Sequence, residues 1–169
     1  CMDCPVGKVM PLNGAAKCVD CIPGQFQDQQ GEQQCKDCLV GQYRLNTIND
    51  TNLTKCMDCP VGKVMPLNGA AKCIDCIPGQ YQDQNGRIVC KDCAINTAST
   101  DRKRDTPCDV CGTGRTAANG SLVCSECLAG QFEETTSMGE EICSSCSPGN
   151  YTDASNMDAC KQCPLGYAQ

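Results

Sequence analysis

Residues 73–93 read CIDCIPGQYQDQNGRIVCKDC, and the four cysteines in this stretch decide the fold. They form two Cys-x-x-Cys pairs, with the turn signals Pro78-Gly79 and Asn85-Gly86 between them. Pro followed by Gly fits the middle of a type II turn, and Asn-Gly is a strong two-residue hairpin signal. The stretch therefore predicts a turn, a short strand, a hairpin turn and a second short strand, held between two cysteine pairs.

The same pattern fills the whole chain. All 20 cysteines of the 169-residue sequence fall into ten Cys-x-x-Cys pairs, whose first members follow one another at intervals of 16 to 21 residues, most often 17. Gly stands three residues after every pair except at Asn96, and Asn is the other residue that tolerates a left-handed backbone. No helical period is present. We expect tandem repeats with strands of three to five residues, short enough to fall below formal assignment, and irregular at the repeat that holds Asn96 and Arg104.

A longer period lies above the repeat. Residues 1–38 and 56–93 are identical at 32 of 38 positions, so three repeats form a block of 55 residues. We therefore expect a first block over residues 1–55, a second over 56–107, and a diverged third block over 108–169 that stops within a repeat. The chain starts on Cys1 and ends in mid-motif, so we expect it to be a segment of a longer secreted protein.

The composition excludes one large apolar core. The sequence has no His, no Trp, two Phe and four Tyr, whereas its cysteine share exceeds the roughly 8–10% that marks a disulfide scaffold. Such cysteine density belongs in an oxidising compartment, so we expect an extracellular protein: secreted, at the cell surface or in the matrix. The predicted fold is small and disulfide-rich. It consists of short β-hairpins and irregular segments in an elongated tandem-repeat rod with almost no helix, in which only neighbouring repeats are in contact.

A disulfide ladder is the favoured pairing, because the evenly placed Gly and Cys landmarks favour a uniform scheme. In a ladder the second cysteine of one pair bonds to the first cysteine of the next. The bonds are Cys4–Cys18, Cys21–Cys35, Cys38–Cys56, Cys59–Cys73, Cys76–Cys90, Cys93–Cys108, Cys111–Cys124, Cys127–Cys143 and Cys146–Cys160. Cys1 and Cys163 would then need partners outside the segment. A crossed scheme, such as Cys1–Cys18 with Cys4–Cys21, remains the main alternative, since spacing does not prove connectivity.

Other uses of the cysteines are weaker interpretations. Two pairs 13 residues apart resemble a four-cysteine zinc ribbon, but the pairs form one even series without grouping into fours. A thioredoxin-like role needs one reactive pair at the start of a helix. Without His, most acid–base and nucleophilic arrangements are absent as well. We therefore expect no enzyme, no metal and no cofactor other than N-linked glycans.

Charge and hydropathy limit the partners. The net charge of −6 argues against nucleic acid, and the lack of an apolar run of about 18 residues argues against membrane insertion within this segment. The single basic run, Arg102-Lys103-Arg104, is flanked by Asp101 and Asp105. A heparin-like contact there is less favoured than a solvated loop.

Four Asn-x-Ser/Thr sequons predict N-glycosylation. They start at Asn49, Asn52, Asn119 and Asn150. Asn49 and Asn52 fall in the longest loop, so one of them is the first candidate. Asn119 falls at a predicted hairpin tip and comes next.

The repeat resembles the ephrin-receptor-like cysteine-rich repeat. The resemblance is carried by Cys-x-x-Cys-Pro-x-Gly-x-Phe/Tyr patterns such as Cys56-Met57-Asp58-Cys59-Pro60-Val61-Gly62 and Cys73-Ile74-Asp75-Cys76-Ile77-Pro78-Gly79-Gln80-Tyr81. The single-loop modules of tumour-necrosis-factor receptors and the cysteine-rich regions of growth-factor receptors look similar. The resemblance implies an elongated, secreted or ectodomain rod with glycans on its loops, and it transfers no ligand-binding residue.

For function we favour a structural subunit of an extracellular filament, coat or surface appendage. Near-identical blocks suit repeated equivalent contacts, and repeated heterologous contacts build linear assemblies. The expected partners are proteins, either copies of this chain or other chains of one assembly. The alternative is a spacer or ligand-binding ectodomain of a cell-surface receptor or adhesin. The divergence from Cys93 to Cys146 favours this alternative, because a binding face lets copies diverge.

Overall fold

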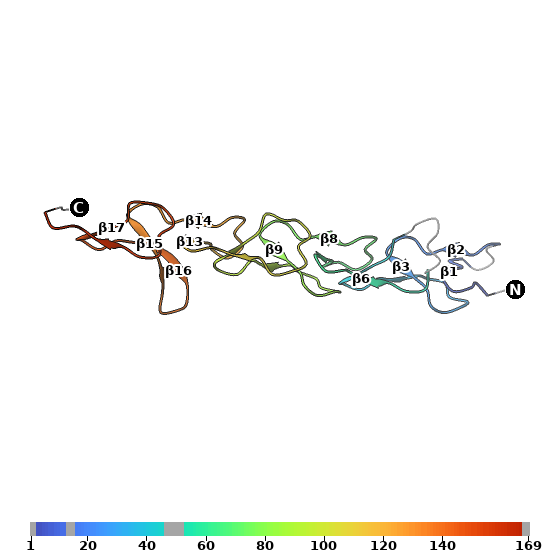
Figure 1. Ribbon diagram of the computed structural model, residues 1–169. Helices are drawn as coiled ribbons and strands as arrows, with labels where there is room; N and C mark the ends of the chain where they lie inside the picture. Colours follow the sequence, from blue (N-terminus) through green and yellow to red (C-terminus); the bar gives the residue numbers. More distant parts are fainter. Residues whose placement is uncertain (1–2, 13–15, 46–52, 167–169) are drawn as a thin grey trace. The chain divides into compact units, whose positions relative to one another are not determined.

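The computed structural model describes residues 3–12, 16–45 and 53–166, and these residues form nine two-stranded antiparallel sheets and no helix (Figure 1). The prediction of short hairpins without helix is confirmed. The hairpins are β1 (Lys8–Val9) with β2 (Val19–Asp20), β3 (Gln25–Phe26) with β4 (Lys36–Asp37), β5 (Gln42–Tyr43) with β6 (Met57–Asp58), β7 (Lys63–Val64) with β8 (Ile74–Asp75), β9 (Gln80–Tyr81) with β10 (Lys91–Asp92), β11 (Thr97–Ala98) with β12 (Asp109–Val110), β13 (Arg115–Thr116) with β14 (Ser125–Glu126), β15 (Gln131–Thr135) with β16 (Glu141–Ser145), and β17 (Asn150–Tyr151) with β18 (Lys161–Gln162).

Strand lengths and positions differ from the prediction. In each hairpin the first strand directly follows the turn residue that stands three residues after a cysteine pair, and the second strand includes the two residues inside the next pair. Gln80 thus pairs with Asp92, and Tyr81 with Lys91. The expected three to five residues per strand are wrong for every hairpin except β15–β16, where each strand has five. The strands are short because the described Asn-Gly turns bond to the preceding repeat, through Gly69, Gly86 and Gly120, instead of closing their own hairpin.

Nine disulfide bonds close the hairpins, and they are the nine bonds of the ladder. We number the disulfide loops as repeats 1 to 9 in chain order. The bonded Cα atoms lie 5.3 to 5.9 Å apart, in the range typical of unstrained disulfides. Each loop joins residues 13 to 18 positions apart, and closing a loop of this size stabilises the fold by roughly 3 kcal/mol in the chain-entropy model.

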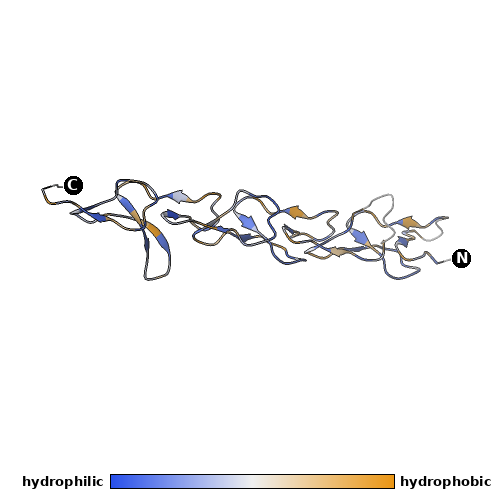
Figure 2. Cartoon of the chain, viewed as in Figure 1, coloured by the Kyte–Doolittle hydropathy of each residue, from blue (hydrophilic) through white to orange (hydrophobic). Residues whose placement is uncertain are grey.

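The interior consists mainly of these disulfides. The second cysteine of a pair is typically the more deeply buried, and Cys38, Cys59, Cys93 and Cys127 are all 0% exposed. Few aliphatic side chains join them, whereas strands β2 and β8 expose Val19 (53%) and Ile74 (52%). Figure 2 accordingly shows orange segments scattered among blue ones rather than gathered in a continuous interior. Cross-links therefore substitute for the apolar core that the composition does not supply.

Two backbone hydrogen bonds recur at the junctions between neighbouring repeats. In the first, the turn glycine after a pair donates its N–H to a carbonyl of the next repeat, as from Gly41 to Met65 at 2.7 Å. In the second, the turn glycine near the tip of a repeat donates to the second cysteine at the start of the preceding one, as from Gly69 to Cys38 at 2.8 Å. These bonds satisfy turn amides that the short hairpins leave free.

Repeats two apart are also in contact, so the expectation that only neighbouring repeats touch is wrong. A Cβ on Gly24 of repeat 2 would overlap the backbone of Gly69 in repeat 4, and one on Gly41 of repeat 3 would overlap Gly86 of repeat 5. Gly24 and Gly41 both have positive φ angles, of 82° and 78°. The glycines are therefore required by close backbone approach as well as by turn geometry.

The described chain divides into two compact parts. One contains Cys1–Cys76 and Gln82–Cys90, and the other contains Ile77–Tyr81 and Lys91–Gln169. The boundary falls within repeat 5. The three-block organisation rests on sequence identity and stays a prediction.

Candidate interaction surface

A buried slot at the sixth residue after a pair was not predicted from the sequence. Gln27, Arg44 and Gln82 occupy it with exposures of only 1 to 2%. The amide of Gln27 donates to the Gln34 carbonyl at 2.6 Å, and that of Gln82 to the Val89 carbonyl at 2.8 Å. These long polar side chains bond to backbone that no strand covers, so they stabilise the loops rather than form a site. The available sequence signal was their fixed position, six residues after a pair and directly after Phe26, Tyr43 or Tyr81.

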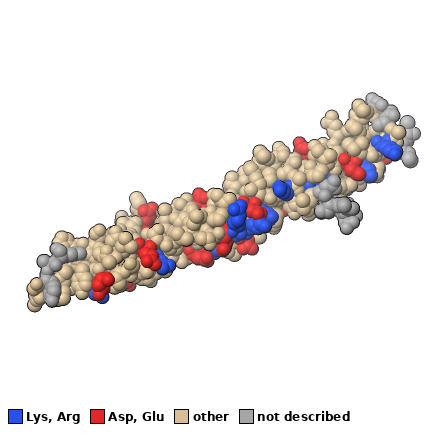
Figure 3. Space-filling view, turned by 90° about the horizontal axis from the view of Figure 1, so that it is seen from above, with Lys and Arg blue, Asp and Glu red and all other residues tan. Residues whose placement is uncertain are grey.

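The carboxylates inside the regular cysteine pairs are partnered across their hairpins. Gln25, Gln42 and Gln80 donate to the aspartates opposite them at 2.8 to 3.0 Å. Lys8 pairs with Asp20 at 3.1 Å and Lys63 with Asp75 at 3.0 Å. On the face drawn in Figure 3, basic and acidic groups lie side by side rather than forming a surface of one sign. These repeated polar pairs hold the register of the hairpins.

The basic run is partly structural, which corrects the expectation of a solvated loop. The Arg104 side chain is only 11% exposed, and its guanidinium donates to Asp109 Oδ1 at 2.7 Å and to Asp101 Oδ2 at 3.0 Å. Hydrogen bonding to Asp109 raises the pKa of Arg104. Near the tip of this repeat the left-handed residue is Lys103, with a φ of 58°. It lies one position before Arg104, which stands four residues before the next pair, where most repeats have Gly. The predicted irregularity of the repeat is confirmed, and Arg104 pins the irregular loop.

The sequons lie in different surroundings. Asn49 and Asn52 fall outside the described residues. Asn119 is exposed beside a tip glycine, and its amide lies 3.4 Å from Asp92 Oδ2. Asn150 is half-buried in β17, and the Thr152 hydroxyl of its sequon is buried, accepting from the Gly130 amide at 2.6 Å. Of the two described sequons, Asn119 is therefore the more accessible in the folded chain.

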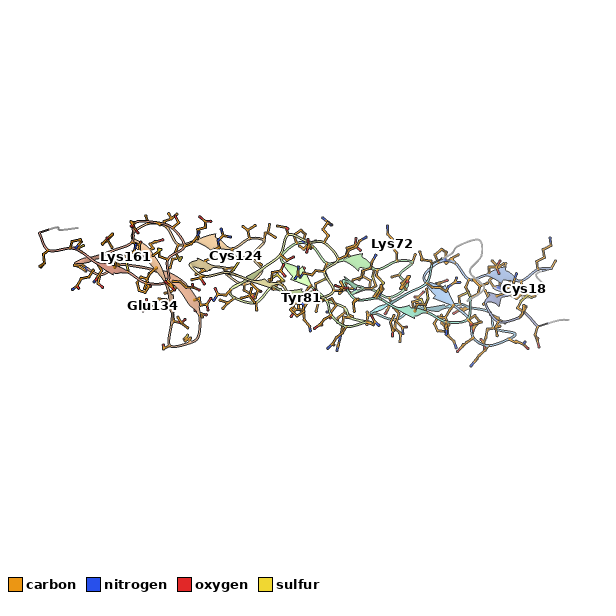
Figure 4. All side chains as sticks on the ribbon, viewed as in Figure 1. Cys18, Lys72, Tyr81, Cys124, Glu134 and Lys161 are labelled. Atoms are coloured by element: carbon orange, nitrogen blue, oxygen red, sulfur yellow. A yellow bond between two sulfur atoms is a disulfide. The ribbon has the colours of Figure 1, made fainter. Side chains whose placement is uncertain are left out.

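Repeat 8 departs most from the pattern. Its hairpin β15–β16 has five paired residues per strand and extends away from the neighbouring loops (Figure 1). Glu134, labelled in Figure 4, lies on this hairpin, whereas Cys124 and Lys161 lie on the flanking repeats. The interval of 19 residues between Cys124 and Cys143 was the sequence signal for the extra length.

A glutamate carboxylate replaces a backbone acceptor where repeat 8 meets repeat 7. At the corresponding junctions the turn glycine donates to a main-chain carbonyl, but Gly114 donates to Glu133 Oε2 at 2.6 Å. Glu141 lies diagonally across the hairpin from Glu133, on the same face. Burial and the adjacent Glu133 carboxyl raise the pKa of Glu141. The hairpin therefore holds two carboxyls that repel each other when both are ionised.

A shallow groove of about 390 Å³ lies beside this hairpin. Ile95, Ala117, Ala118 and Ile142 supply apolar lining, and Glu140, Glu141 and Asn119 supply polar lining. Ile95 and Ile142 remain 44% and 42% exposed. No Lys or Arg lines the groove, so its polar groups are acidic or neutral.

A second groove, of about 380 Å³, lies between the early repeats and has a different character. Val9, Pro11 and Ile22 line it together with Gln25, Gln33 and Gln34, and Asp20, the one acidic residue among its described lining, is already paired with Lys8. It is built from regular repeats. The groove beside β16 is the more distinctive of the two, because it depends on the long hairpin.

Neither metal nor membrane chemistry adds a site to the described residues. Within residues 3–12, 16–45 and 53–166, no three His, Cys, Asp or Glu side chains are grouped to hold a metal ion. No helix in the described part of the chain has the length and apolar character needed to cross a membrane.

Comparison with known families supports the resemblance read from the repeats. The model described as "Tyrosine-protein kinase ephrin type A/B receptor-like" matches the chain twice, at residues 7–49 and 62–106, which together are just over half of it. A comparison with curated proteins gives no match. Repeats of this kind are non-catalytic, extracellular, disulfide-rich modules. Most of the groove beside β16 lies outside both matched segments.

Proposed function

Because the chain belongs to the ephrin-receptor-like cysteine-rich family, we propose that it is part of the ectodomain of a cell-surface receptor or adhesin. The observation that carries this proposal is the family match over both near-identical blocks. The filament or coat subunit that we favoured from the sequence receives no support from this match, and the receptor-type alternative is closer to it. The proposed location is therefore extracellular, at the cell surface.

Within this ectodomain the two kinds of repeat have different roles. Regular repeats, whose carboxylates are paired across each hairpin, act as a spacer that resists unfolding and proteolysis. Repeat 8 contributes to recognition, because its hairpin is extended and its glutamates lack basic partners in the described structure. Binding sites on repeat scaffolds arise where loops depart from the common pattern.

Surface labelling of the native, full-length protein tests the proposal. Intact cells that express it are treated with a membrane-impermeant biotin reagent, and the protein is detected with an antibody raised against residues 1–169. We expect labelling in intact cells and recovery with the membrane fraction. Labelling only after permeabilisation, with free thiols on most cysteines, would contradict the extracellular assignment.

N-glycosylation is a second component of the proposal, at Asn49 or Asn52 first and then at Asn119 and Asn150. Glycosidase treatment in heavy-oxygen water converts each occupied Asn to a labelled Asp that mass spectrometry locates. Conversion at one site or more is expected for secreted material from a eukaryotic host. Unmodified asparagine at all four sequons would refute it.

A further inference from the structure

The groove beside β16 combines apolar and acidic lining residues. The apolar ones include Ile95 from repeat 6, Ala117 from repeat 7 and Ile142 from repeat 8. The acidic ones are Glu140, directly before β16, and Glu141, its first residue. Three successive repeats therefore contribute to one concave surface.

The glutamates of the β15–β16 hairpin have no basic partner among the described residues. The hairpin segment from Gln131 to Ser145 contains four glutamates and no Lys or Arg. Among the described residues, no basic side chain forms an ion pair with Glu134, Glu140 or Glu141. By contrast, Glu126 on the adjacent hairpin is paired with Arg115 at 2.5 Å. Unpaired like charges gathered at one edge favour a cationic partner.

The apolar lining restricts the chemical class of the partner further. A small inorganic cation would gain nothing from Ile95 and Ile142, which stay more than two-fifths exposed in the chain by itself. An Arg or Lys side chain has both features that the groove complements, since it carries a long aliphatic stem and a charged head. The volume of about 390 Å³ is sufficient for one such side chain and a neighbouring apolar residue.

We propose that this groove binds a segment of a partner protein that presents an arginine or lysine next to an apolar residue. The stem and the apolar neighbour lie on Ile95 and Ile142, and the charged head lies at Glu140 and Glu141. This inference rests on the proposed ectodomain function and specifies the chemistry of its partner. The energy comes from relief of carboxylate repulsion and burial of the exposed isoleucines.

Nuclear magnetic resonance titration of the oxidised, isotope-labelled chain tests the proposal. The probe is the peptide acetyl-Gly-Leu-Arg-Leu-Gly-amide, and acetyl-Gly-Leu-Gln-Leu-Gly-amide and spermidine serve as comparison ligands. We expect amide shifts confined to residues 94–96, 115–119 and 140–143 with the arginine peptide, and at least five-fold weaker binding of the glutamine peptide. Shifts spread over acidic residues of the whole chain, no saturable shifts, or equal local binding of spermidine would overturn the proposal.

Matched variants locate the contact. Glu141→Lys and Asp158→Lys change the net charge equally, but Asp158 is an exposed residue of repeat 9 and only Glu141 lines the groove. We expect at least five-fold weaker peptide binding for Glu141→Lys and less than two-fold for Asp158→Lys. Equal losses would mean a general charge effect. Ile95→Ser, in another repeat, keeps the test valid if the hairpin variant misfolds, and it should also weaken binding at least three-fold.

The N-glycosylation proposed for Asn119 provides a further check, because this residue lines the groove. Asn119→Gln removes the sequon and keeps a side-chain amide. Chain from a glycosylating host should bind the peptide with or without this substitution. Binding only after the substitution would show that the native glycan covers the groove, and would overturn the proposal. Failure of peptide binding alongside successful surface labelling would remove the groove and leave the ectodomain assignment intact.

Discussion

Gly24→Ala, compared with Gly130→Ala, isolates the cost of the contact between repeats two apart. Both glycines occupy the same place in their repeats and have nearly the same φ, 82° and 84°. A methyl group on Gly24 would overlap the backbone of Gly69, whereas a methyl group on Gly130 would have no described atom within 4 Å. The two variants therefore share the backbone strain and differ in the steric clash.

The expected magnitudes follow from these two terms. A non-glycine residue in the left-handed region costs about 1–2 kcal/mol, and this applies to both variants. Forcing a methyl group against backbone adds about 1–3 kcal/mol, and this applies to Gly24→Ala alone. The clash also threatens the bond from the Gly24 amide to the Arg44 carbonyl, now 2.9 Å long. We expect the junction around Gly24 to lose about 2 kcal/mol more than that around Gly130.

Hydrogen–deuterium exchange with intact disulfides measures this difference. The reporting amide in Gly24→Ala is Gly69, bonded to the Cys38 carbonyl at 2.8 Å, and in Gly130→Ala it is Asn156, bonded to Cys127 at 2.9 Å. A difference of 2 kcal/mol corresponds to roughly 30-fold faster exchange at Gly69 relative to Asn156, each normalised to the unsubstituted chain. Equal acceleration in the two variants would refute the close approach of repeats 2 and 4.

Three further predictions concern single side chains. Asn156 has a φ of 63° and a buried Oδ1 without a partner in the described structure, so Asn156→Gly should raise the free energy of local opening around repeat 9 by about 1 kcal/mol and slow amide exchange there. The Oδ1 of Asn96 accepts from the Ala117 amide, so Asn96→Gly should stabilise its repeat less, and the reverse order would contradict the reasoning. Arg104→Ala should loosen repeat 6 by about 1 kcal/mol in the same assay because it removes the guanidinium bonds to Asp101, Asp109 and the Pro107 carbonyl, whereas Arg102→Ala should change little, and equal effects would show that Arg104 is not the anchor. The raised pKa of Glu141 stabilises the folded hairpin at acidic pH, and this contribution is lost as pH rises through that pKa toward neutrality, so Glu141→Gln should protect the β15–β16 amides at pH 7 and leave them unchanged at pH 4. Hydrogen bonds from Lys36 and Lys161 lower the pKa values of Asp28 and Asp153, so the stability that these two pairs add is lost at acid pH, which is the opposite direction. Unchanged exchange in Glu141→Gln at both pH values would refute the carboxyl repulsion.

Backbone features that depend on one residue were predictable from the sequence. The positive φ of Asn96, 60°, follows from its place in the glycine slot, and the irregular loop at Arg104 follows from the missing glycine there. Features that depend on contact between repeats were not predictable. The requirement for Gly24 reflects the position of Gly69, 45 residues later, which no local signal encodes.

The candidate site shows the same distinction. The long interval before Cys143 indicates an insertion in repeat 8, but not that it pairs as the extended hairpin β15–β16. Glu133 resembles any solvated glutamate in the sequence, and only the structure places its carboxylate on the Gly114 amide. The groove lined by Ile95 and Ile142 likewise depends on how three repeats meet.

Disulfide mapping tests the central claim most directly, because the hairpin ladder supports both the fold and the extracellular assignment. Native protein is alkylated, digested without reduction, and analysed by mass spectrometry. The account predicts a peptide that links Cys76 to Cys90, with equivalent links for the other eight loops. A peptide that links Cys73 to Cys90, or free thiols accompanied by about five zinc ions per chain, would contradict it.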